Sequence, residues 1–148
     1  MSVKVRDTLR YIVRNYPYPR DLTKTRVTKM VYLADWFMVE EYSRQITDIQ
    51  WFFDHYGPYV SDVLDAADDD KNIRILETQS SFGTVKYIVQ PKVDKQKLKY
   101  SLSEEEIEIL NKVIDETKSL TWNDFISYIY ETSPVKNAEK YSDLNLFK

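Results

Sequence analysis

Apolar residues recur at helical spacing near the start of the chain. Val5, Leu9, Ile12 and Val13 occupy positions i, i+4, i+7 and i+8, so they share one face of a helix. We expect this helix to end near Asn15, because the proline-containing segment YPYPRD follows it. Each proline lacks an amide donor and restricts the residue before it, which prevents the helix from continuing.

The strongest helical pattern lies between residues 27 and 41. Leu33 and Trp36 add apolar surface beside its main row, which predicts a central helix packed on more than one side. Thr23 or Thr25 is suited to cap the first turn. The main row recurs every three or four positions and consists of Val27, Met30, Val31, Ala34, Phe37 and Met38, with Glu41 at its end.

A short segment rich in β-forming residues predicts a strand near residues 49–54. Gly57 and Pro58 follow it. Glycine can adopt backbone conformations that other residues avoid, and proline is tolerated in the first turn of a helix. We therefore interpret this pair as a corner between the strand and a helix that ends at DDDKN. Helical spacing resumes in that segment at Val60, Val63, Leu64 and Ala67.

Two further β-rich segments, 73–77 and 85–90, flank the sequence TQSSFGT. This arrangement predicts a β-hairpin with Gly83 in its turn. Together with the strand near 49–54, the hairpin provides a small antiparallel sheet.

The last third of the chain is mainly helical. Ser103 and Glu106 have the spacing of a capping box and start one helix. Thr121 opens the next helix, which stops before Ser133-Pro134. The tail at 136–148 holds one short turn or frays. These elements predict an α+β fold, mainly helical, with about five to six helices in a single domain that spans residues 1–148.

The composition of the chain excludes several kinds of functional site. The chain has no cysteine and two glycines, which excludes disulfides, thiolate metal sites and glycine-rich phosphate loops. No apolar run approaches the roughly 20 residues that a membrane span needs, and the first residues, MSVKVRDTLR, lack the apolar core of a signal peptide. We expect a cytoplasmic protein with no membrane, metal or cofactor site.

Charge is distributed unevenly. Residues 1–30 carry eight Lys or Arg against two Asp, whereas residues 31–70 carry one Arg against ten Asp or Glu. Arg6, Arg10 and Arg14 lie four apart and form a basic stripe on the first helix. Two helices followed by a hairpin also allow a winged-helix regulator that binds DNA. The sequence pI of about 5.3 and the lack of a short helix-turn-helix pair make nucleic acid the weaker choice beside a protein partner.

His55 is the only histidine, and a small hydrolase that uses it is a third hypothesis. Its neighbours supply no nucleophile and no cluster of metal ligands, so we interpret it as a structural residue. The run Asp68–Asp70 lacks the spaced oxygens and the glycine of a calcium loop. The residues therefore predict a protein that is not an enzyme.

Three stretches of the sequence resemble the Panacea (SocA-like) antitoxin domain family over roughly residues 20–135. LTKTRVTKMVYLADWFMVEEYSRQIT is similar to a family helix of the form L-x-K-L-x-Y-x-A-D and its Arg-x-Ile/Leu-Thr turn. FFDHYGPYVSDVL is similar to an aromatic strand and a G-P-x-V corner, and SLTWNDFISYIYETSP to a final helix. Tyr130 and Val135 depart from the His-x-x-x-Pro-Trp end of many members. The motif residues are Tyr32, Ala34, Asp35, Gly57, Pro58 and Val60.

The resemblance implies a non-enzymatic protein that neutralises a cognate toxin by direct binding, in some cases by handing the toxin to a cellular protease. We expect the acidic region 31–70 or the basic first helices to meet a complementary toxin surface. The identity of the toxin and the oligomeric state stay open. The candidate contacts are Arg10, Arg14, Arg44, Tyr56 and Tyr59.

Overall fold

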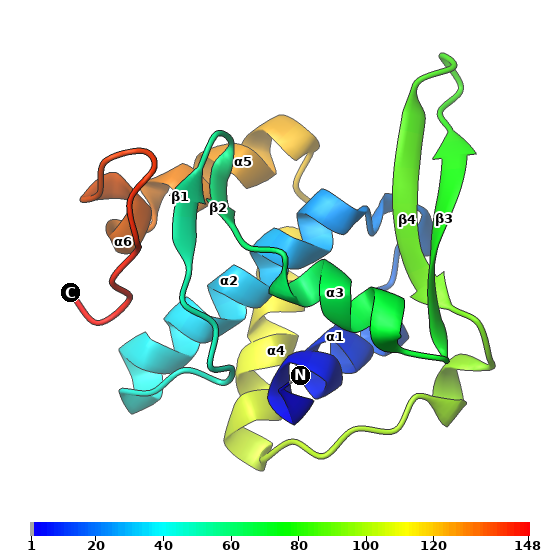
Figure 1. The fold of residues 1–148 in the computed structure, drawn as a ribbon, viewed down its shortest axis with the longest axis horizontal. Coiled ribbons are helices and arrows are strands. Elements are labelled where there is room, and N and C mark those ends of the chain that lie inside the picture. The colour runs from blue at the N-terminus through cyan, green and yellow to red at the C-terminus, as the bar shows by residue number, and fades with distance from the viewer. Residues whose placement is uncertain (1) are drawn as a thin grey trace.

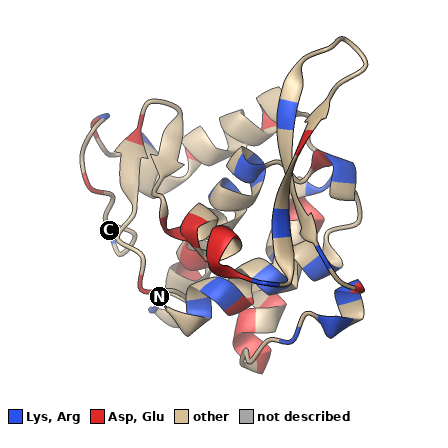
Figure 2. Ribbon diagram, turned by 45° about the vertical axis from the view of Figure 1, so that its right-hand side comes forward, with Lys and Arg blue, Asp and Glu red and all other residues tan. Residues whose placement is uncertain are grey.

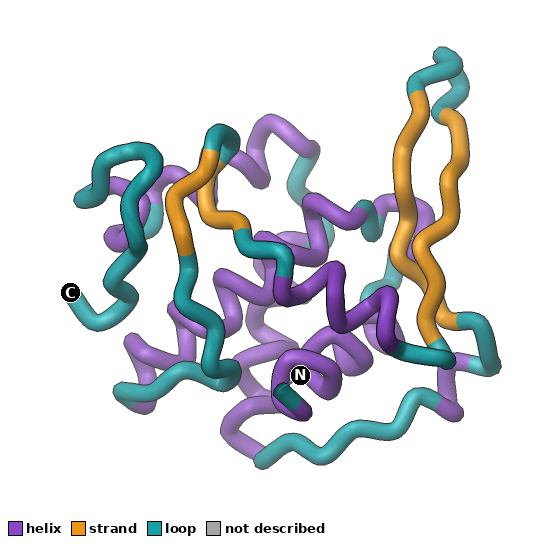
Figure 3. Tube along the Cα trace, in the orientation of Figure 1, coloured by secondary structure: helices purple, strands orange, loops and turns teal. Residues whose placement is uncertain are grey.

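The computed structural model describes residues 2–148. Six α-helices and two separate two-stranded antiparallel sheets form an α+β domain in this part of the chain (Figures 1 and 3). The elements are, in chain order, α1 (Val3–Asn15), η1 (Pro19–Asp21), α2 (Lys24–Tyr42), β1 (Phe52–Asp54), β2 (Gly57–Tyr59), α3 (Asp62–Asp69), β3 (Ile73–Gln79), β4 (Val85–Pro91), η2 (Lys95–Lys97), α4 (Glu104–Thr117), α5 (Trp122–Glu131) and α6 (Ser133–Lys136).

Helix α2 forms the centre of the fold, as its wide apolar surface predicts. It packs against α1, α3 and α4, and Leu33, Ala34 and Met38 are fully buried. The Thr23 hydroxyl accepts a hydrogen bond from the Arg26 amide and caps the first turn. The helix therefore has neighbours on several sides, which explains why its apolar residues are not confined to one stripe.

The local signals at the other helices are confirmed. Helix α1 ends at Asn15. Ser103 and Glu106 form the capping box of α4 with both reciprocal hydrogen bonds, and the Thr121 hydroxyl caps α5. These interactions join residues within one turn, so the sequence determines them directly.

The interpretation of Gly57-Pro58 as a corner between a strand and a helix is wrong. Gly57, with φ at 101°, begins strand β2, and Pro58 pairs with Phe53 of β1. Phe53 uses its own N–H and carbonyl on the opposite edge, toward Ser142 and Tyr141. Its partner Pro58 therefore needs no amide donor toward β1. The helix begins only at Asp62.

The predicted strand near 49–54 is shorter than expected and does not join the other hairpin. β1 covers Phe52–Asp54, and it pairs with β2 alone among the named strands. The second hairpin, β3–β4, is longer than predicted, with seven residues in each strand and Gly83 at a φ of 79° in its turn. In Figures 1 and 3 this hairpin projects from the helical body, so that its base packs and its tip does not.

The tail does not fray. After α6, its backbone runs along the free edge of β1, where the Tyr141 N–H donates to the Phe53 carbonyl and the Leu144 N–H donates to the Trp51 carbonyl. Leu144 and Leu146 are buried. The last residues thus complete the β1–β2 side of the core. No helix within residues 2–148 is long and apolar enough to cross a membrane.

Candidate functional site

The motif residue Asp35 is a fully buried anchor for the loop after α2. Its Oδ1 accepts hydrogen bonds from the Ile46 and Thr47 amides at 3.0 and 2.9 Å. Its Oδ2 accepts from the Thr47 hydroxyl at 2.5 Å, from Trp51 Nε1 at 2.9 Å and from Gln45 Nε2 at 3.2 Å. Burial raises the pKa of Asp35 to about 6, although these hydrogen bonds oppose the rise. The carboxylate fixes the turn between α2 and β1.

Tyr32 and Ala34 are also internal. The Tyr32 hydroxyl forms a 2.8 Å hydrogen bond with the Thr132 hydroxyl at the end of α5, and its ring meets Trp51 edge to face at 5.6 Å. Ala34 is fully buried. Tyr32 therefore joins α2 to two segments that are distant in sequence.

Lys29, one of the cations of the basic first helices, is buried and holds the Gly57-Pro58 segment. Its buried Nζ donates a 3.1 Å hydrogen bond to the Pro58 carbonyl. A Cβ on Gly57 would lie 3.6 Å from the Tyr130 ring, so α5 covers this strand closely. Val60 is half-buried after β2. The motif residues of the two central stretches thus assemble the scaffold.

We expect Lys29 to make the protein more stable at mildly alkaline pH. Burial lowers its pKa from 10.5 to about 8, while the Asp54 carboxylate opposes the shift. Between pH about 8 and pH 10.5, the Lys29 amine is protonated in the unfolded chain and neutral in the folded chain. The free energy of unfolding therefore rises with pH over this range. Urea unfolding should show a gain of roughly 2 kcal/mol from about pH 8 to about pH 9.5, below the ionisation range of ordinary tyrosines.

The matched variant is Lys29→Met, which keeps an unbranched apolar stem without the titrating amine. It should lose the alkaline gain. A wild-type profile as flat as that of the variant would show that the Lys29 amine keeps its proton in the folded state.

The predicted basic contacts on α1 already have internal partners. Arg10 binds the buried Asp70 carboxylate with two hydrogen bonds of 2.6 and 2.9 Å and also donates to the Lys99 carbonyl. Arg14 is half-buried, donates to the Leu98 carbonyl and lies over the Tyr100 ring. The stripe therefore joins α1 to α3 and to the connector before α4.

Arg44 has a similar role on another side. Its guanidinium lies 3.0 Å from Glu106, which also binds Lys4 at 2.6 Å. Burial alone would raise the pKa of Glu106, but hydrogen bonds from Lys4, the Ser103 amide and Arg44 hold it below its usual value. Half of the Arg44 side chain stays exposed, so its role as a partner contact stays a prediction.

The two predicted tyrosine contacts lie on the β1–β2 hairpin. Tyr56 is 70% exposed in its turn, and Tyr59 is half-buried. His55 is exposed beside them, with its Nδ1 3.0 Å from the Tyr141 hydroxyl and its ring against Tyr56. No group of three residues suited to hold a metal ion occurs within residues 2–148. The candidate contacts thus come from α1, from the loop after α2 and from the β1–β2 hairpin, and their role toward a partner stays a prediction.

The acidic region of the sequence divides into internal and exposed parts. Asp35 and Asp70 are buried, whereas the carboxylates of α3 are exposed, and Figure 2 shows them as red segments of that helix. The exposed group consists of Asp62, Asp65, Asp68 and Asp69.

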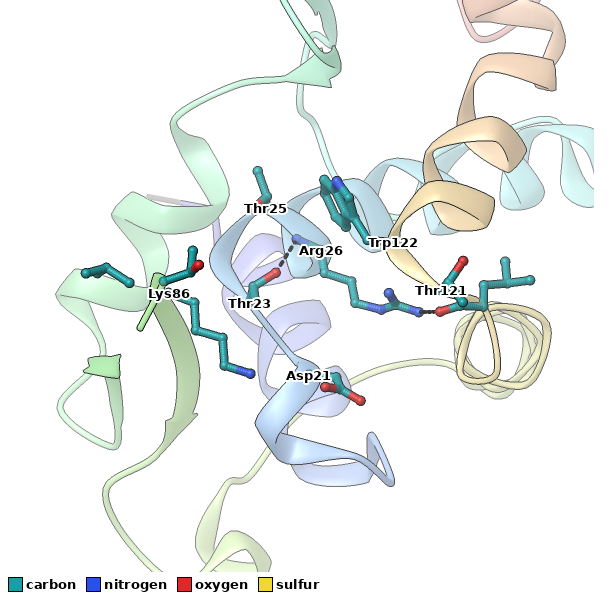
Figure 4. Close-up of a pocket in the computed structure, with 10 residues that line it drawn as sticks. Asp21, Thr23, Thr25, Arg26, Lys86, Thr121 and Trp122 are labelled. Atoms are coloured by element: carbon teal, nitrogen blue, oxygen red, sulfur yellow. Dashed lines mark hydrogen bonds between the residues drawn. The ribbon is translucent and has the colours of Figure 1, made fainter. Parts of the chain in front are cut away.

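A groove that the sequence did not reveal lies between the β3–β4 hairpin and the first turns of α2 and α5 (Figure 4). Its volume is about 630 Å³, within the range of ligand pockets. Trp122, 43% exposed, stands on one side, and Val85, 46% exposed, on the other. The remaining lining residues are Asp21, Thr23, Thr25, Arg26, Thr84, Lys86, Leu120 and Thr121.

Arg26 supplies a buried positive charge to this groove. Its side chain extends from α2 toward the loop between α4 and α5 (Figure 4), where Nη2 donates to the carbonyls of Thr117 and Leu120. Phe125 packs against the guanidinium at 4.6 Å. No carboxylate within residues 2–148 forms an ion pair with Arg26. The groove therefore combines apolar walls with an uncompensated cation.

Comparison with known proteins gives the family. A family model described as antitoxin SocA-like, Panacea domain, matches residues 27–134. The chain belongs to this family. No curated protein and no solved structure matches the chain. The matched range in this Panacea domain protein runs from α2 to Pro134, and the buried residues Asp35 and Lys29 lie within it.

Proposed function

We propose that this Panacea domain protein is an antitoxin that neutralises a cognate toxin protein by binding it directly, without catalysis. The family match carries the proposal. The internal position of the motif residues supports it, because a scaffold built from Tyr32, Asp35 and Pro58 leaves other residues free to vary on the surface. We favour direct masking of the toxin, because delivery to a protease would require a third protein in addition to the toxin and this one.

The alternative function, a regulator that binds DNA, receives less support from the geometry. A basic helix face binds phosphates when its cations are free. Arg10 is committed to Asp70, and Arg14 to the 98–100 segment. Helix α3 packs beside α1 and presents its exposed acidic face next to it, and this negative charge would repel a nucleic acid backbone. We therefore favour a protein partner.

Co-expression tests the proposal. The product of the gene adjacent to this one should stop growth when expressed alone, and this protein should restore growth when both are expressed. Rescue should persist in a host that lacks its major cytoplasmic proteases, because masking does not require degradation. Restored growth only in hosts that contain those proteases would show that the protein delivers the toxin to a protease and does not act by masking it. An adjacent product that is toxic but not rescued would contradict the proposal.

A further inference from the structure

Strand β4 has an open backbone edge that faces the groove. In an antiparallel pair, the backbone groups of alternate residues point toward the partner strand and away from it. The Val89 N–H donates to the Leu22 carbonyl at 3.0 Å, on the side away from β3. Val85 and Tyr87 lie four and two residues earlier, so their N–H groups point the same way. Outside the β3–β4 pairing, neither N–H donates a backbone hydrogen bond within residues 2–148.

The chain itself shows how an extended segment fits this edge. Leu22 and Thr23 run beside the base of β4, where Thr23 forms an antiparallel bridge with Ile88. The chain then turns into α2 and leaves the outer half of the edge without a partner. Toward the hairpin turn, the edge of β4 borders the groove, whose lining includes Thr23 on the α2 side and Val85 on the β4 side.

The groove has the chemistry to select a segment that is both apolar and acidic. Val85 and Trp122 offer exposed apolar surface on opposite sides. Arg26 and Lys86 add positive charge: their side chains donate to backbone carbonyls of Thr117, Leu120 and Arg20, and neither forms an ion pair within residues 2–148. Asp21 is the one carboxylate among the lining residues. The first turns of α2 and α5 also present their positive ends here.

We propose that the β4 edge and this groove bind an extended segment of a partner protein, which adds as a strand next to Val85–Tyr87 and places acidic and apolar side chains between Arg26, Lys86 and Trp122. Main-chain hydrogen bonds hold such a strand, and pockets for its side chains select it. The identification of that partner as the toxin rests on the proposed function. The strand addition itself does not.

A titration without toxin tests the binding mode. Full-length protein labelled with ¹⁵N is titrated with a synthetic octapeptide of alternating valine and aspartate, and separately with one of alternating valine and lysine. The acidic peptide should shift the amide resonances of Val85 and Tyr87 and the indole resonance of Trp122. The amides of Glu77 and Gln79, which point outward on the opposite edge of the hairpin, provide the internal control and should stay unchanged.

Other results would overturn the proposal. These are shifts at Glu77 and Gln79 in place of Val85 and Tyr87, equal binding of the lysine peptide, or no shifts with the acidic peptide. Concentration-dependent shifts at Val85 without peptide would mean that a second copy of the chain occupies the edge, and would also overturn it.

A pair of proline variants connects the groove to the toxin. Val85→Pro removes an outward N–H from the groove edge, and Gln79→Pro removes the corresponding N–H from its cross-strand partner on the β3 edge. Val85→Pro should bind the toxin about tenfold more weakly than wild type, because it loses one main-chain hydrogen bond to the added strand and disturbs the adjacent ones. The toxin affinity of Gln79→Pro should stay near that of wild type. Equal toxin affinity of the two variants and wild type would show that the toxin binds at another surface. This result would overturn the groove as the toxin site without contradicting the antitoxin function.

Discussion

Replacing Asp35 with alanine is expected to lower the free energy of unfolding by about 4 kcal/mol, among the largest effects of single substitutions. The carboxylate accepts five hydrogen bonds, two of them from the Ile46 and Thr47 amides. Alanine leaves these donors buried without an acceptor, and each such donor costs about 1–3 kcal/mol unless water reaches it. The turn after α2 and the Trp51 indole both lose their anchor.

Urea unfolding at neutral pH measures this effect, and Asp48→Ala is the matched control. Asp48 lies one residue beyond the Asp35-bound turn, is exposed and has no ion pair within residues 2–148. Its loss should change stability by about 0.5 kcal/mol or less. Equal stabilities for the two variants would show that the Asp35 network does not hold the fold together.

Replacing Arg10 with alanine is expected to cost about 3 kcal/mol, because removal of one member of a buried ion pair leaves the other charge unpaired. The Asp70 side chain is 1% exposed and receives both Arg10 bonds. Burial alone would raise the pKa of Asp70, but the Arg10 hydrogen bond and the Asn72 amide hold it below 3.8. The contribution of this carboxylate is therefore complete above that pH and disappears on acidification.

Arg14→Ala is the control, since Arg14 lies one turn later on α1 and has no ion pair within residues 2–148. Thermal and urea unfolding at neutral pH should separate the two variants clearly. Arg10→Ala should still rescue toxin-expressing cells at temperatures where it is folded. If Arg10→Ala is folded but does not rescue the cells, Arg10 contacts the toxin directly.

Helices α1, α2, α4 and α5 could be predicted from the sequence because the interactions that define them are local. Thr23, Ser103 and Thr121 bond to amides three residues later, and the apolar spacing needs no knowledge of other segments. The Gly83 turn follows the same rule. The β1–β2 hairpin could not be predicted, because Pro58 is compatible with β2 only when Phe53 turns its backbone toward residues 141–142. That pairing joins segments almost ninety residues apart.

The same distinction applies to the candidate site. The motif residues Tyr32 and Asp35 could be predicted as structural, whereas the acceptors of Arg10 and Arg44 lie about sixty residues away in the chain. The groove combines three segments, near residues 21–26, 84–86 and 120–122. Its sequence signals are weak: a tryptophan directly after the Thr121 cap, and apolar residues at alternate positions near the turn of a predicted hairpin.

Neutralisation by direct binding requires that the purified protein bind its purified toxin, which calorimetric titration measures. The toxin should be the adjacent gene product that this protein rescues in cells. We predict saturable binding at a fixed stoichiometry, and weaker binding for Val85→Pro than for Gln79→Pro. Rescue in cells without measurable binding between the two purified proteins would rule out neutralisation by direct binding.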